Sequence, residues 1–423
     1  MKILLVGGGG REHTLAWALS RSPRPTELIA APGNPGIARH ARCVAVKDHE
    51  IDGLRDLALA ERVELTVVGP ELPLSLGLVD RFRERGLAVF GPTQAAARLE
   101  SSKTFAKDLM ARHGIPTARF RACADGASAR AWCRELGPPL VVKADGLAAG
   151  KGVIICRTLE EADAAVAAWL ERRAFGDAGA RVVIEEFMVG EEASFFAITD
   201  GDAILPLAGA QDHKTVFDDD RGPNTGGMGA YSPAPVLDAA MAERVMAEIV
   251  RPTVAAMAKE GVPFAGFLYV GLMITRGGPK VVEFNCRFGD PECQVVLPRL
   301  ATDLLPLLRA VAQGGGIPAT VPWRPDASVC VVMASGGYPG VYETGRPIAG
   351  VEDAEALPGV TVFHAGTARR DGTLVTAGGR VLAVQALGHD VRSAVDTAYA
   401  AVARIRFEGA HYRRDIARRA LAR

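Results

Sequence analysis

Short apolar runs alternate with helical stretches through the first hundred residues, a pattern that few fold classes accommodate. Each run is brief and bounded by Gly, Pro or Asp, as buried parallel strands are. The four predicted strands are Ile3–Val6, Cys43–Val46, Leu65–Val68 and Ala88–Phe90. Between them, Asp52–Arg62 and Leu74–Arg85 place apolar residues at helical spacing. Strands that alternate with helices predict an open parallel α/β sheet, which binds ligands at the carboxyl ends of its strands.

A second unit begins near Ser101–Ser102, which is expected to cap the helix that follows. Helices are expected over Lys103–His113, Leu159–Arg173 and Ala239–Glu260. Further strands are expected over Leu140–Val142, Val153–Cys156, Arg181–Glu185, Ala193–Thr199, Ala203–Leu207, Gly266–Ile274 and Lys280–Phe284. The polar, glycine-rich stretch Gln211–Tyr231 is predicted to be a loop. A Gly- and Pro-rich linker at 314–325 precedes a last segment of β-runs with one terminal helical region.

The composition indicates a globular protein of the cytosol. Basic and acidic side chains balance at 49 each, which argues against a nucleic-acid surface with its usual basic excess. The longest apolar stretch, Ala265–Ile274, is half the length of a membrane helix of about 20 residues. Seven cysteines show no Cys-x-x-Cys spacing, which disfavours a zinc ribbon and fits reduced thiols. We therefore expect a cytoplasmic protein with neither a nucleic-acid nor a membrane partner.

The glycine run after the first strand is expected to bind an anion, because backbone N–H groups and a helix N-terminus meet there. Spacing excludes a dinucleotide fingerprint: counted from Gly7, the third glycine position holds Glu12, and counted from Gly8 it holds His13. A tight turn without a ligand is the alternative. Arg11 favours the anion, because a guanidinium can bind phosphate through two parallel hydrogen bonds.

A second glycine-rich loop, Lys143-Ala-Asp-Gly-Leu-Ala-Ala-Gly-Lys-Gly, is similar to a P-loop in composition but not in spacing. Three residues rather than four separate Gly146 from Gly150, and Gly152 stands where Ser or Thr would bind magnesium. Small residues make a flap whose amides, with Lys151, can close over phosphates. Lys143 ends an apolar strand and would be costly to bury without an anion. A solvated surface hairpin is the alternative, but two bracketing lysines favour a nucleotide phosphate.

Two segments carry weaker signals. The strand end at Glu186–Met188 offers backbone groups for an adenine edge, and Phe187 or Met188 for its face, although the pattern taken alone favours an ordinary strand end. The stretch Gln211–Tyr231 is longer than most structureless loops in compact domains, so it is expected to be functional, with disorder as the alternative. Within it, Asp212 is expected to hold a cationic amine.

The strongest chemical signal is the segment Val281-Val-Glu-Phe-Asn-Cys-Arg-Phe-Gly-Asp-Pro-Glu. Glu283 and Asn285 are two apart on a strand and therefore share a face, where their oxygens suit magnesium together with substrate phosphates. Arg287 continues that face and can stabilise a phosphoryl group in transfer. Asp290 follows where the chain turns. An exposed strand with alternating polar residues is the alternative, which the strongly apolar residues between them disfavour.

Several segments together carry a family resemblance. They are Gly-Gly-Arg-Glu-His at 9–13, Ala-Pro-Gly-Asn at 31–34, Val-Gly-Pro-Glu at 68–71, the flap at 143–153, Gln-Asp-His-Lys at 211–214, Gly-Pro-Asn-Thr-Gly-Gly-Met-Gly-Ala-Tyr-Ser-Pro at 222–233, Arg-Phe-Gly-Asp-Pro-Glu-Cys-Gln at 287–294, Ser-Gly-Gly-Tyr-Pro-Gly at 335–340 and Phe-His-Ala-Gly-Thr at 363–367. In this order the chain resembles the ATP-grasp superfamily and, within it, the phosphoribosylamine–glycine ligase family. The resemblance extends over essentially the whole chain.

This resemblance implies an α/β fold of three domains. An N-terminal open parallel α/β domain that binds phosphoribosylamine is expected over 1–101, a central ATP-grasp domain over 102–324 with a mobile lid lobe at about 119–188, and a small α+β C-terminal domain over 325–423. The implied activity is ATP-dependent ligation of glycine to 5-phosphoribosylamine through glycyl phosphate, in de novo purine biosynthesis, with Mg²⁺ or Mn²⁺. The alternatives are another ATP-grasp carboxylate–amine ligase of purine metabolism and a non-catalytic nucleotide-binding protein. A monomer is expected.

The resemblance also implies roles for single residues. Expected ATP contacts are Lys103, Lys143, Gly150, Lys151, Gly152, Glu185, Glu186, Phe187, Met188 and Glu192. Expected metal ligands are Glu283 and Asn285. Expected substrate contacts are Gly8, Gly9, Gly10, Arg11, Glu71, Asp212, Gly227, Arg287, Gly289 and Asp290. Expected catalytic residues are Arg287, Lys151 and Asp290. Many superfamily members carry a second metal-binding Glu on the preceding strand, where this chain has Gly271, so the number of metal ions stays open.

Overall fold

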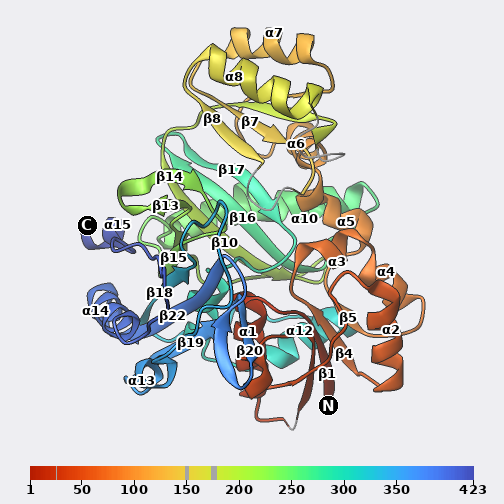
Figure 1. Ribbon diagram of the computed structural model, residues 1–423. Coiled ribbons are helices and arrows are strands. Elements are labelled where there is room, and N and C mark those ends of the chain that lie inside the picture. Colours follow the sequence, from red (N-terminus) through yellow and green to blue (C-terminus); the bar gives the residue numbers. More distant parts are fainter. Residues whose placement is uncertain (25, 148–151, 173–178) are drawn as a thin grey trace.

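Five parallel strands form the first sheet of the computed structural model, which describes residues 1–24, 26–147, 152–172 and 179–423 (Figure 1). In sheet order they are β3 (Arg42–Cys43), β2 (Glu27–Pro32), β1 (Lys2–Gly7), β4 (Leu65–Val68) and β5 (Val89–Phe90). Leu4 and Val6 of the central strand β1 enter one hydrophobic core, and Ile3 and Leu5 enter another. Burial on both faces explains why β1 is apolar throughout. The predicted open parallel α/β sheet is confirmed.

The helices of this unit differ in part from the prediction. They are α1 (Gly10–Ser20), η1 (Ile37–Arg39), α2 (Ile51–Ala60), α3 (Glu71–Ser75) and α4 (Leu78–Arg83). The single helix expected over Leu74–Arg85 is wrong, because Gly77 adopts a φ of +83° between α3 and α4. The sequence also fails to predict β2, whose short apolar run fits a helix as well as a strand. The strand expected at Cys43–Val46 ends at Cys43 and is exposed.

A small lobe stands apart from the rest of the molecule and includes α7 and α8 at the top of Figure 1. Its antiparallel sheet has the order β6 (Phe120–Cys123), β9 (Val182–Glu186), β7 (Leu140–Ala144) and β8 (Val153–Cys156). Its helices are α7 (Gly126–Leu136), α8 (Leu159–Val166) and the π-helical continuation η2 (Ala167–Glu171). Trp132 and Trp169 pack into a core that belongs to this lobe alone. The lobe therefore has its own hydrophobic support.

A second antiparallel sheet forms the centre of the molecule. Its order is β11 (Ile204–Pro206), β10 (Glu191–Thr199), β16 (Gly266–Thr275) and β17 (Gly278–Asn285). The helices of this part are α5 (Gln94–Ser101), α6 (Lys103–His113), α9 (Ala239–Val245), η5 (Met246–Val250) and α10 (Arg251–Lys259). Ser102 caps α6 as predicted, because its hydroxyl accepts the N–H of Phe105 at 3.2 Å. The predicted hairpin of β16 and β17 is also confirmed.

The prediction of a loop over Gln211–Tyr231 is wrong. The segment contains β12 (Gln211–Asp212), β13 (Thr215–Phe217), η4 (Asp218–Asp220), β14 (Arg221–Asn224) and β15 (Gly229–Ser232). β13 pairs with β14, while β15 pairs with β12 and with β18, which lies about a hundred residues further along the chain. Sequence patterns did not reveal these strands, because their glycines hide the alternation and their partner is distant.

The last sheet joins this segment to the C-terminal part of the chain. Its order is β12, β15, β18 (Ala327–Ala334), β22 (Arg380–Gly388) and β19 (Val360–His364). The remaining elements are α11 (Cys293–Val296), η6 (Leu297–Arg299), α12 (Leu304–Gln313), α13 (Val351–Glu355), β20 (Thr367–Arg370), β21 (Thr373–Thr376), α14 (Val391–Val402) and α15 (Arg418–Leu421). The strands of this sheet come from both sides of the predicted domain boundary between residues 324 and 325. The predicted limits of the three domains stay a prediction.

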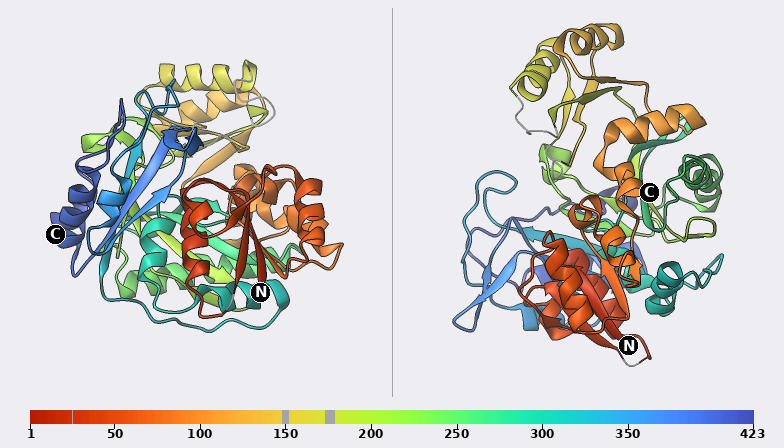
Figure 2. Two further views of the ribbon diagram at one scale, coloured as in Figure 1. Left: turned by 60° about the horizontal axis from the view of Figure 1, so that its bottom comes forward. Right: turned by 90° about the vertical axis from the view of Figure 1, so that its right-hand side faces the viewer.

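The N-terminal unit and the C-terminal sheet lie side by side, as the red and blue ribbons show (Figure 2). The backbone N–H of His364 donates to Nδ1 of His13 at 2.7 Å, and Nδ2 of Asn34 donates to the carbonyl oxygens of Gly8 and His364 at 2.8 Å each. These bonds fix the start of α1 and the glycine loop against β19. No helix in the described part of the chain has the length and apolar character that crossing a bilayer requires.

Candidate active site

The glycine loop after β1 lies against the turn that follows β17. Nη1 of Arg11 donates to the carbonyl oxygen of Phe288 at 3.2 Å. A methyl group on Gly10 would lie 2.7 Å from Nε2 of Gln294, and one on Gly8 would lie 2.6 Å from the carbonyl oxygen of Gly33. Only glycine permits such close approach of the backbone. The structure thus brings together two segments of the predicted substrate site that are nearly 280 residues apart in the sequence.

Arg287 links the end of β17 to the N-terminal unit. Its Nε donates to Oε2 of Glu71 at 3.1 Å, and its Nη2 lies 3.1 Å from Oε1 of Glu100. Burial by itself would raise the pKa of Glu71, but Arg287 and Arg11 outweigh burial and lower this pKa to about 2. Burial raises the pKa of Glu100 to about 7 despite the opposing effect of Arg287. The predicted substrate residues Arg11, Glu71 and Arg287 therefore form one charged cluster.

Asp290 is held at the same place by a residue from the C-terminal sheet. Nε2 of Gln294 donates to Oδ1 of Asp290 at 2.7 Å, and Nη2 of Arg380 lies 3.3 Å from Oδ2. Nη1 of Arg380 also donates to the carbonyl oxygens of Asp290 at 2.7 Å and Gly226 at 2.6 Å. Burial would raise the pKa of Asp290, but Arg380 and Arg11 outweigh burial and lower it. Asp290 therefore carries a negative charge toward the glycine loop.

Gly227, a predicted substrate contact, touches this turn. It has a φ of +112°, and a methyl group on it would lie 2.4 Å from Cδ of Pro291. A methyl group on Gly289 would lie 2.4 Å from Oε2 of Glu292, whose Oε1 accepts the hydroxyl of Ser194 at 2.9 Å. Gly227 is thus required by its close packing against Pro291, and a side chain at position 289 would have to displace the carboxylate of Glu292.

The predicted metal ligands face a lysine that the prediction did not include. Nζ of Lys214 lies 3.8 Å from Oε1 of Glu283 and 3.4 Å from Oε2 of Glu192. Burial would raise the pKa of Glu283, but Lys214 and Lys143 outweigh burial and lower it. Burial also raises the pKa of Asp212 to about 7, although Lys214 opposes the shift. One ammonium group thus offsets the charge of several neighbouring carboxylates.

Asn285 fits the second ligand position. In the amide orientation that its neighbours require, Nδ2 donates to Oε1 of Glu100 at 3.1 Å and to the carbonyl oxygen of Phe284 at 2.9 Å. This directs Oδ1, which can accept a hydrogen bond or bind a cation, away from Glu100. Gly271 pairs directly with Glu283 on the adjacent strand. Within the described residues no three His, Cys, Asp or Glu side chains gather as a metal cluster.

Lys143 is buried at the end of β7 and is paired, as the cost of an isolated buried charge demands. Its Nζ lies 3.0 Å from Oε1 of Glu185 and donates to the carbonyl oxygen of Val282 at 3.0 Å. The other oxygen of Glu185 lies 2.9 Å from Nζ of Lys107. In the structure, Lys143 is therefore paired with Glu185. The predicted contacts of these two side chains with ATP stay predictions.

The remaining predicted ATP contacts lie on the lobe and at the start of α6. Lys103 donates to the carbonyl oxygen of Gly146 at 3.3 Å, and burial lowers the pKa of Lys103. Glu186 lies between Arg119 at 3.0 Å and Lys280 at 3.3 Å. Phe187 is exposed and Met188 is partly exposed, so both side chains are free to receive a ligand. Gly152 accepts the N–H of Ala144, whereas Gly150 and Lys151 lie outside the described residues.

Residues that the sequence did not predict complete the cluster. They are Glu100, Lys107, Lys214, Glu292, Gln294 and Arg380. Lys214, Glu292 and Gln294 lie within the sequence motifs at 211–214 and 287–294 that carry the family resemblance, so the sequence could have indicated them as site residues. Nothing near Glu100, Lys107 or Arg380 marks them, because only the tertiary fold brings these side chains to the site.

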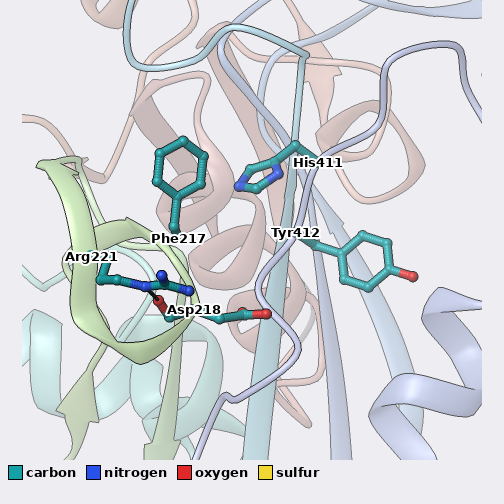
Figure 3. A pocket seen from close by; sticks show the side chains of 5 residues that line it. All are labelled: Phe217, Asp218, Arg221, His411 and Tyr412. Atoms are coloured by element: carbon teal, nitrogen blue, oxygen red, sulfur yellow. Dashed lines mark hydrogen bonds between the residues drawn. The ribbon is translucent and has the colours of Figure 1, made fainter.

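A surface pocket of about 340 Å³ lies elsewhere, between the β13–β14 hairpin and the chain before α15 (Figure 3). Its lining residues are Phe217, Asp218, Arg221, His411 and Tyr412. The rings of Phe217 and His411 meet edge to face with centroids 5.7 Å apart. None of the predicted site residues lines this pocket, so the candidate active site remains the cluster around the end of β17.

Three family models match successive parts of the chain. They describe the N domain of phosphoribosylglycinamide synthetase at residues 1–100, its ATP-grasp (A) domain at 101–293 and its C domain at 328–419. The phosphoribosylamine–glycine ligase of Rhizobium meliloti (strain 1021) is 55% identical over 423 residues, covering 100% of this chain and 99% of the relative. That of Xanthomonas axonopodis pv. citri (strain 306) is 56% identical over 427 residues, with the same coverage.

Solved structures agree with this assignment. The crystal structure of phosphoribosylamine–glycine ligase from Thermotoga maritima superposes with a TM-score of 0.87 at 34% identity, covering 98% of this chain and 100% of that one. The biotin carboxylase domain of the Hydrogenobacter thermophilus 2-oxoglutarate carboxylase, solved with MgADP and bicarbonate, has a TM-score of 0.76 at 17% identity and covers 97% and 91%. The second likeness shows a shared fold alone. On its sequence and its structure, the chain belongs to the phosphoribosylglycinamide synthetase family.

Proposed function

We propose that this chain ligates glycine to 5-phosphoribosylamine and cleaves ATP to ADP and phosphate, forming glycinamide ribonucleotide in de novo purine biosynthesis. The observation that carries the proposal is the meeting of the turn after β17, with Arg287 and Asp290, and the glycine loop after β1. Arg287, two residues beyond β17, contacts Glu71, which follows β4 at the carboxyl edge of the N-terminal sheet, where a parallel α/β sheet binds ligands. A nucleotide site and a second substrate site can thus share one centre.

The first step is phosphoryl transfer to glycine. A carboxylate oxygen of glycine attacks the γ-phosphorus of ATP, and the bond from that phosphorus to the bridging oxygen of ADP breaks. Lys103, Lys143 and the flap residues Gly150, Lys151 and Gly152 bind the phosphates, and Arg287 holds the glycine carboxylate. Because Lys107 lies 2.9 Å from Glu185, that carboxylate keeps a partner when Lys143 turns to a phosphate. Glu185 to Met188 receive adenine, and Glu192 receives the ribose.

The residues at the end of β17 fit a Mg²⁺ or Mn²⁺ ion. Glu283 is held ionised by the surrounding lysines, and Asn285 has its amide nitrogen occupied by Glu100 and its oxygen directed away from that carboxylate. When bound there, such an ion supplies neutralisation of the charge that gathers on the phosphates. Arg287 supplies delocalised positive charge to the same region.

The second step forms the amide bond. The amine of phosphoribosylamine attacks the acyl carbon of glycyl phosphate, the bond from that carbon to the phosphate oxygen breaks, and the nitrogen loses a proton. Asp290 and Asp212 hold the amines, and a pKa of about 7 suits Asp212 to accept that proton. The loop Gly8–Gly10 with Arg11 seats the ribose phosphate, and closure of the flap excludes water that would hydrolyse the acyl phosphate.

The proposal is tested with purified protein, magnesium, ATP and glycine, with and without freshly generated phosphoribosylamine. ADP release that depends on both glycine and phosphoribosylamine is expected. Glycine labelled with ¹⁸O in its carboxylate should pass one labelled oxygen to the released phosphate, because the acyl phosphate carries it. ADP release that does not depend on phosphoribosylamine, but does respond to aminoimidazole ribonucleotide, would favour another ligase of the superfamily. We further propose a cytoplasmic monomer with small-molecule partners alone, which sedimentation at micromolar concentration tests.

A further inference from the structure

Glu100 contacts three successive residues at the end of β17. This side chain is 7% exposed and lies one residue before the end of α5. Oε2 accepts the backbone N–H of Cys286 at 2.7 Å. Oε1 lies 3.1 Å from Nη2 of Arg287 and 3.1 Å from Nδ2 of Asn285. One buried carboxylate thus fixes the backbone and both flanking polar side chains of this strand end.

The contact with Asn285 decides which atom of its amide can reach a cation. When ionised, Glu100 only accepts hydrogen bonds, so it attracts the NH₂ group and repels the carbonyl oxygen of an amide. The carbonyl oxygen of Phe284 has the same preference and lies 2.9 Å from the same nitrogen. If the amide turned by 180°, Oδ1 of Asn285 would face Oε1 of Glu100 and the carbonyl oxygen of Phe284. The NH₂ group would then point toward the cation. Glu100 therefore keeps Oδ1 of Asn285 turned away from its own carboxylate.

Glu100 also holds the guanidinium group of Arg287, a second side chain of the candidate site. Arg287 is held by Glu71 at one nitrogen and by Glu100 at another, so its guanidinium plane has two fixed points. Glu100 also stands three residues before Lys103, the first residue of α6. Glu100 thus lies between the start of α6 in the sequence and the residues that follow β17 in space.

We propose that Glu100 is a positioning residue that sets the amide of Asn285 and the guanidinium of Arg287 for the metal–nucleotide complex. The inference rests on the proposed function and deepens its metal site. Glu100 does not touch the metal or the nucleotide; it acts through the two side chains that do. An ordinary structural ion pair would instead contribute to the stability of the fold without a specific effect on metal-dependent binding.

The test measures the affinity for ADP by calorimetry, with and without Mg²⁺, in the wild type and in Glu100→Gln. The amide of glutamine presents NH₂ to Arg287 or Asn285, which themselves can only donate there. We expect the gain in ADP affinity on adding Mg²⁺ to fall by about 10- to 100-fold, as for other outer partners of metal ligands. The metal-free affinity for ADP should stay unchanged. Glu248→Gln is the matched control, because Glu248 pairs with Arg244 at 2.8 Å on an exposed helix.

A double-mutant cycle sharpens the test. In the double variant Glu100→Gln with Asn285→Asp, donor and acceptor are exchanged, so an oxygen of residue 285 again faces the cation. We expect the double variant to regain part of the magnesium-dependent affinity that Glu100→Gln loses, beyond the sum of the two single effects. Equal losses with and without Mg²⁺, or no loss in Glu100→Gln, would overturn the proposal. If Glu100→Gln does not fold, Glu100→Asp, which shortens the side chain by one methylene, takes its place. The proposal then requires that Glu100→Asp lower the magnesium-dependent gain in ADP affinity and leave the metal-free affinity unchanged.

The wild type separates this inference from the proposed function. If wild-type protein shows neither glycine-dependent turnover nor a gain in ADP affinity with Mg²⁺, the proposed function itself fails. If the wild type shows both and Glu100→Gln behaves like the control, only the role of Glu100 is wrong.

Discussion

Nζ of Lys214 lies 3.8 Å from Oε1 of Glu283, so a protein cation stands beside the carboxylate that is proposed to hold a metal. Lys214 also lies 3.4 Å from Glu192, and burial, which would lower the pKa of Lys214, is outweighed by Glu192 and Asp212, which raise it well above its usual value. The lysine is therefore charged at neutral pH. It offsets the mutual repulsion of the carboxylates and keeps Glu283 ionised.

The first prediction concerns Glu283. Glu283→Gln keeps the shape of the side chain but removes the charge that a divalent ion needs, so turnover should fall by roughly 100-fold and the required Mg²⁺ concentration should rise. Steady-state ADP release over a magnesium titration measures both effects, and thermal unfolding should be unchanged. Glu248→Gln is the control. Near-normal activity of Glu283→Gln at limiting magnesium would contradict the metal assignment.

The second prediction separates the two lysines that flank Glu185. Lys143→Met should raise the KM for ATP by about 10- to 100-fold, the cost of one lost hydrogen bond to a charged group, and leave the KM for glycine nearly unchanged. Glu185 keeps Lys107 at 2.9 Å, so the fold should survive. Lys259→Met, at the exposed end of α10, is the control. Equal increases in both KM values would mean that Lys143 is structural.

Local patterns predicted most of the fold but not all of the site. The buried strand β1, the cap at Ser102 and the hairpin of β16 and β17 follow from apolar runs and turn residues, which act over a few positions. The pairing of β15 with β18 does not, because it depends on two segments that meet only after the chain has folded.

The candidate site residues also differ in whether a local sequence pattern indicates them. Glu283 and Asn285 were predictable because a strand places alternate side chains on one face. Glu100 and Arg380 carry no local signal: Glu100 resembles any polar residue at a helix end, and Arg380 begins a strand nearly a hundred residues beyond Asp290. Their partners are known only when the tertiary structure is known.

The third prediction concerns acid stability and His213. The Nε2 atom of His213 accepts the N–H of Ala417 at 3.0 Å, which requires an unprotonated nitrogen. Burial, helped by Arg413, lowers the pKa of His213 from 6.5 to about 3. Between these values the unfolded chain binds a proton that the folded chain does not, so the free energy of unfolding should fall by about 1.4 kcal/mol per pH unit as the pH drops below 6.5.

Urea unfolding at several pH values between 7 and 4 checks this slope. His213→Gln retains an oxygen that can accept the N–H of Ala417 but cannot bind a proton, so its free energy of unfolding should depend less on pH than that of the wild type. His49→Gln is the control, because His49 is about half exposed. Identical slopes in the wild type and His213→Gln would show that another group causes the acid dependence.

The fourth prediction uses two glycines with similar backbone but different surroundings. Gly227 has a φ of +112° and would place a methyl group 2.4 Å from Cδ of Pro291, whereas Gly86 has a φ of +69° and nothing within 4 Å. Alanine at either position pays about 1–2 kcal/mol for the left-handed backbone. Only Gly227→Ala must also displace Pro291 and, with it, Asp290. Since a shift of about 1 Å in a positioned group can cost roughly 100-fold, kcat/KM for phosphoribosylamine should fall by that order in Gly227→Ala and stay near the wild type in Gly86→Ala. Comparable loss of thermal stability with equal activity in the two variants would show that the contact between Gly227 and Pro291 does not position Asp290.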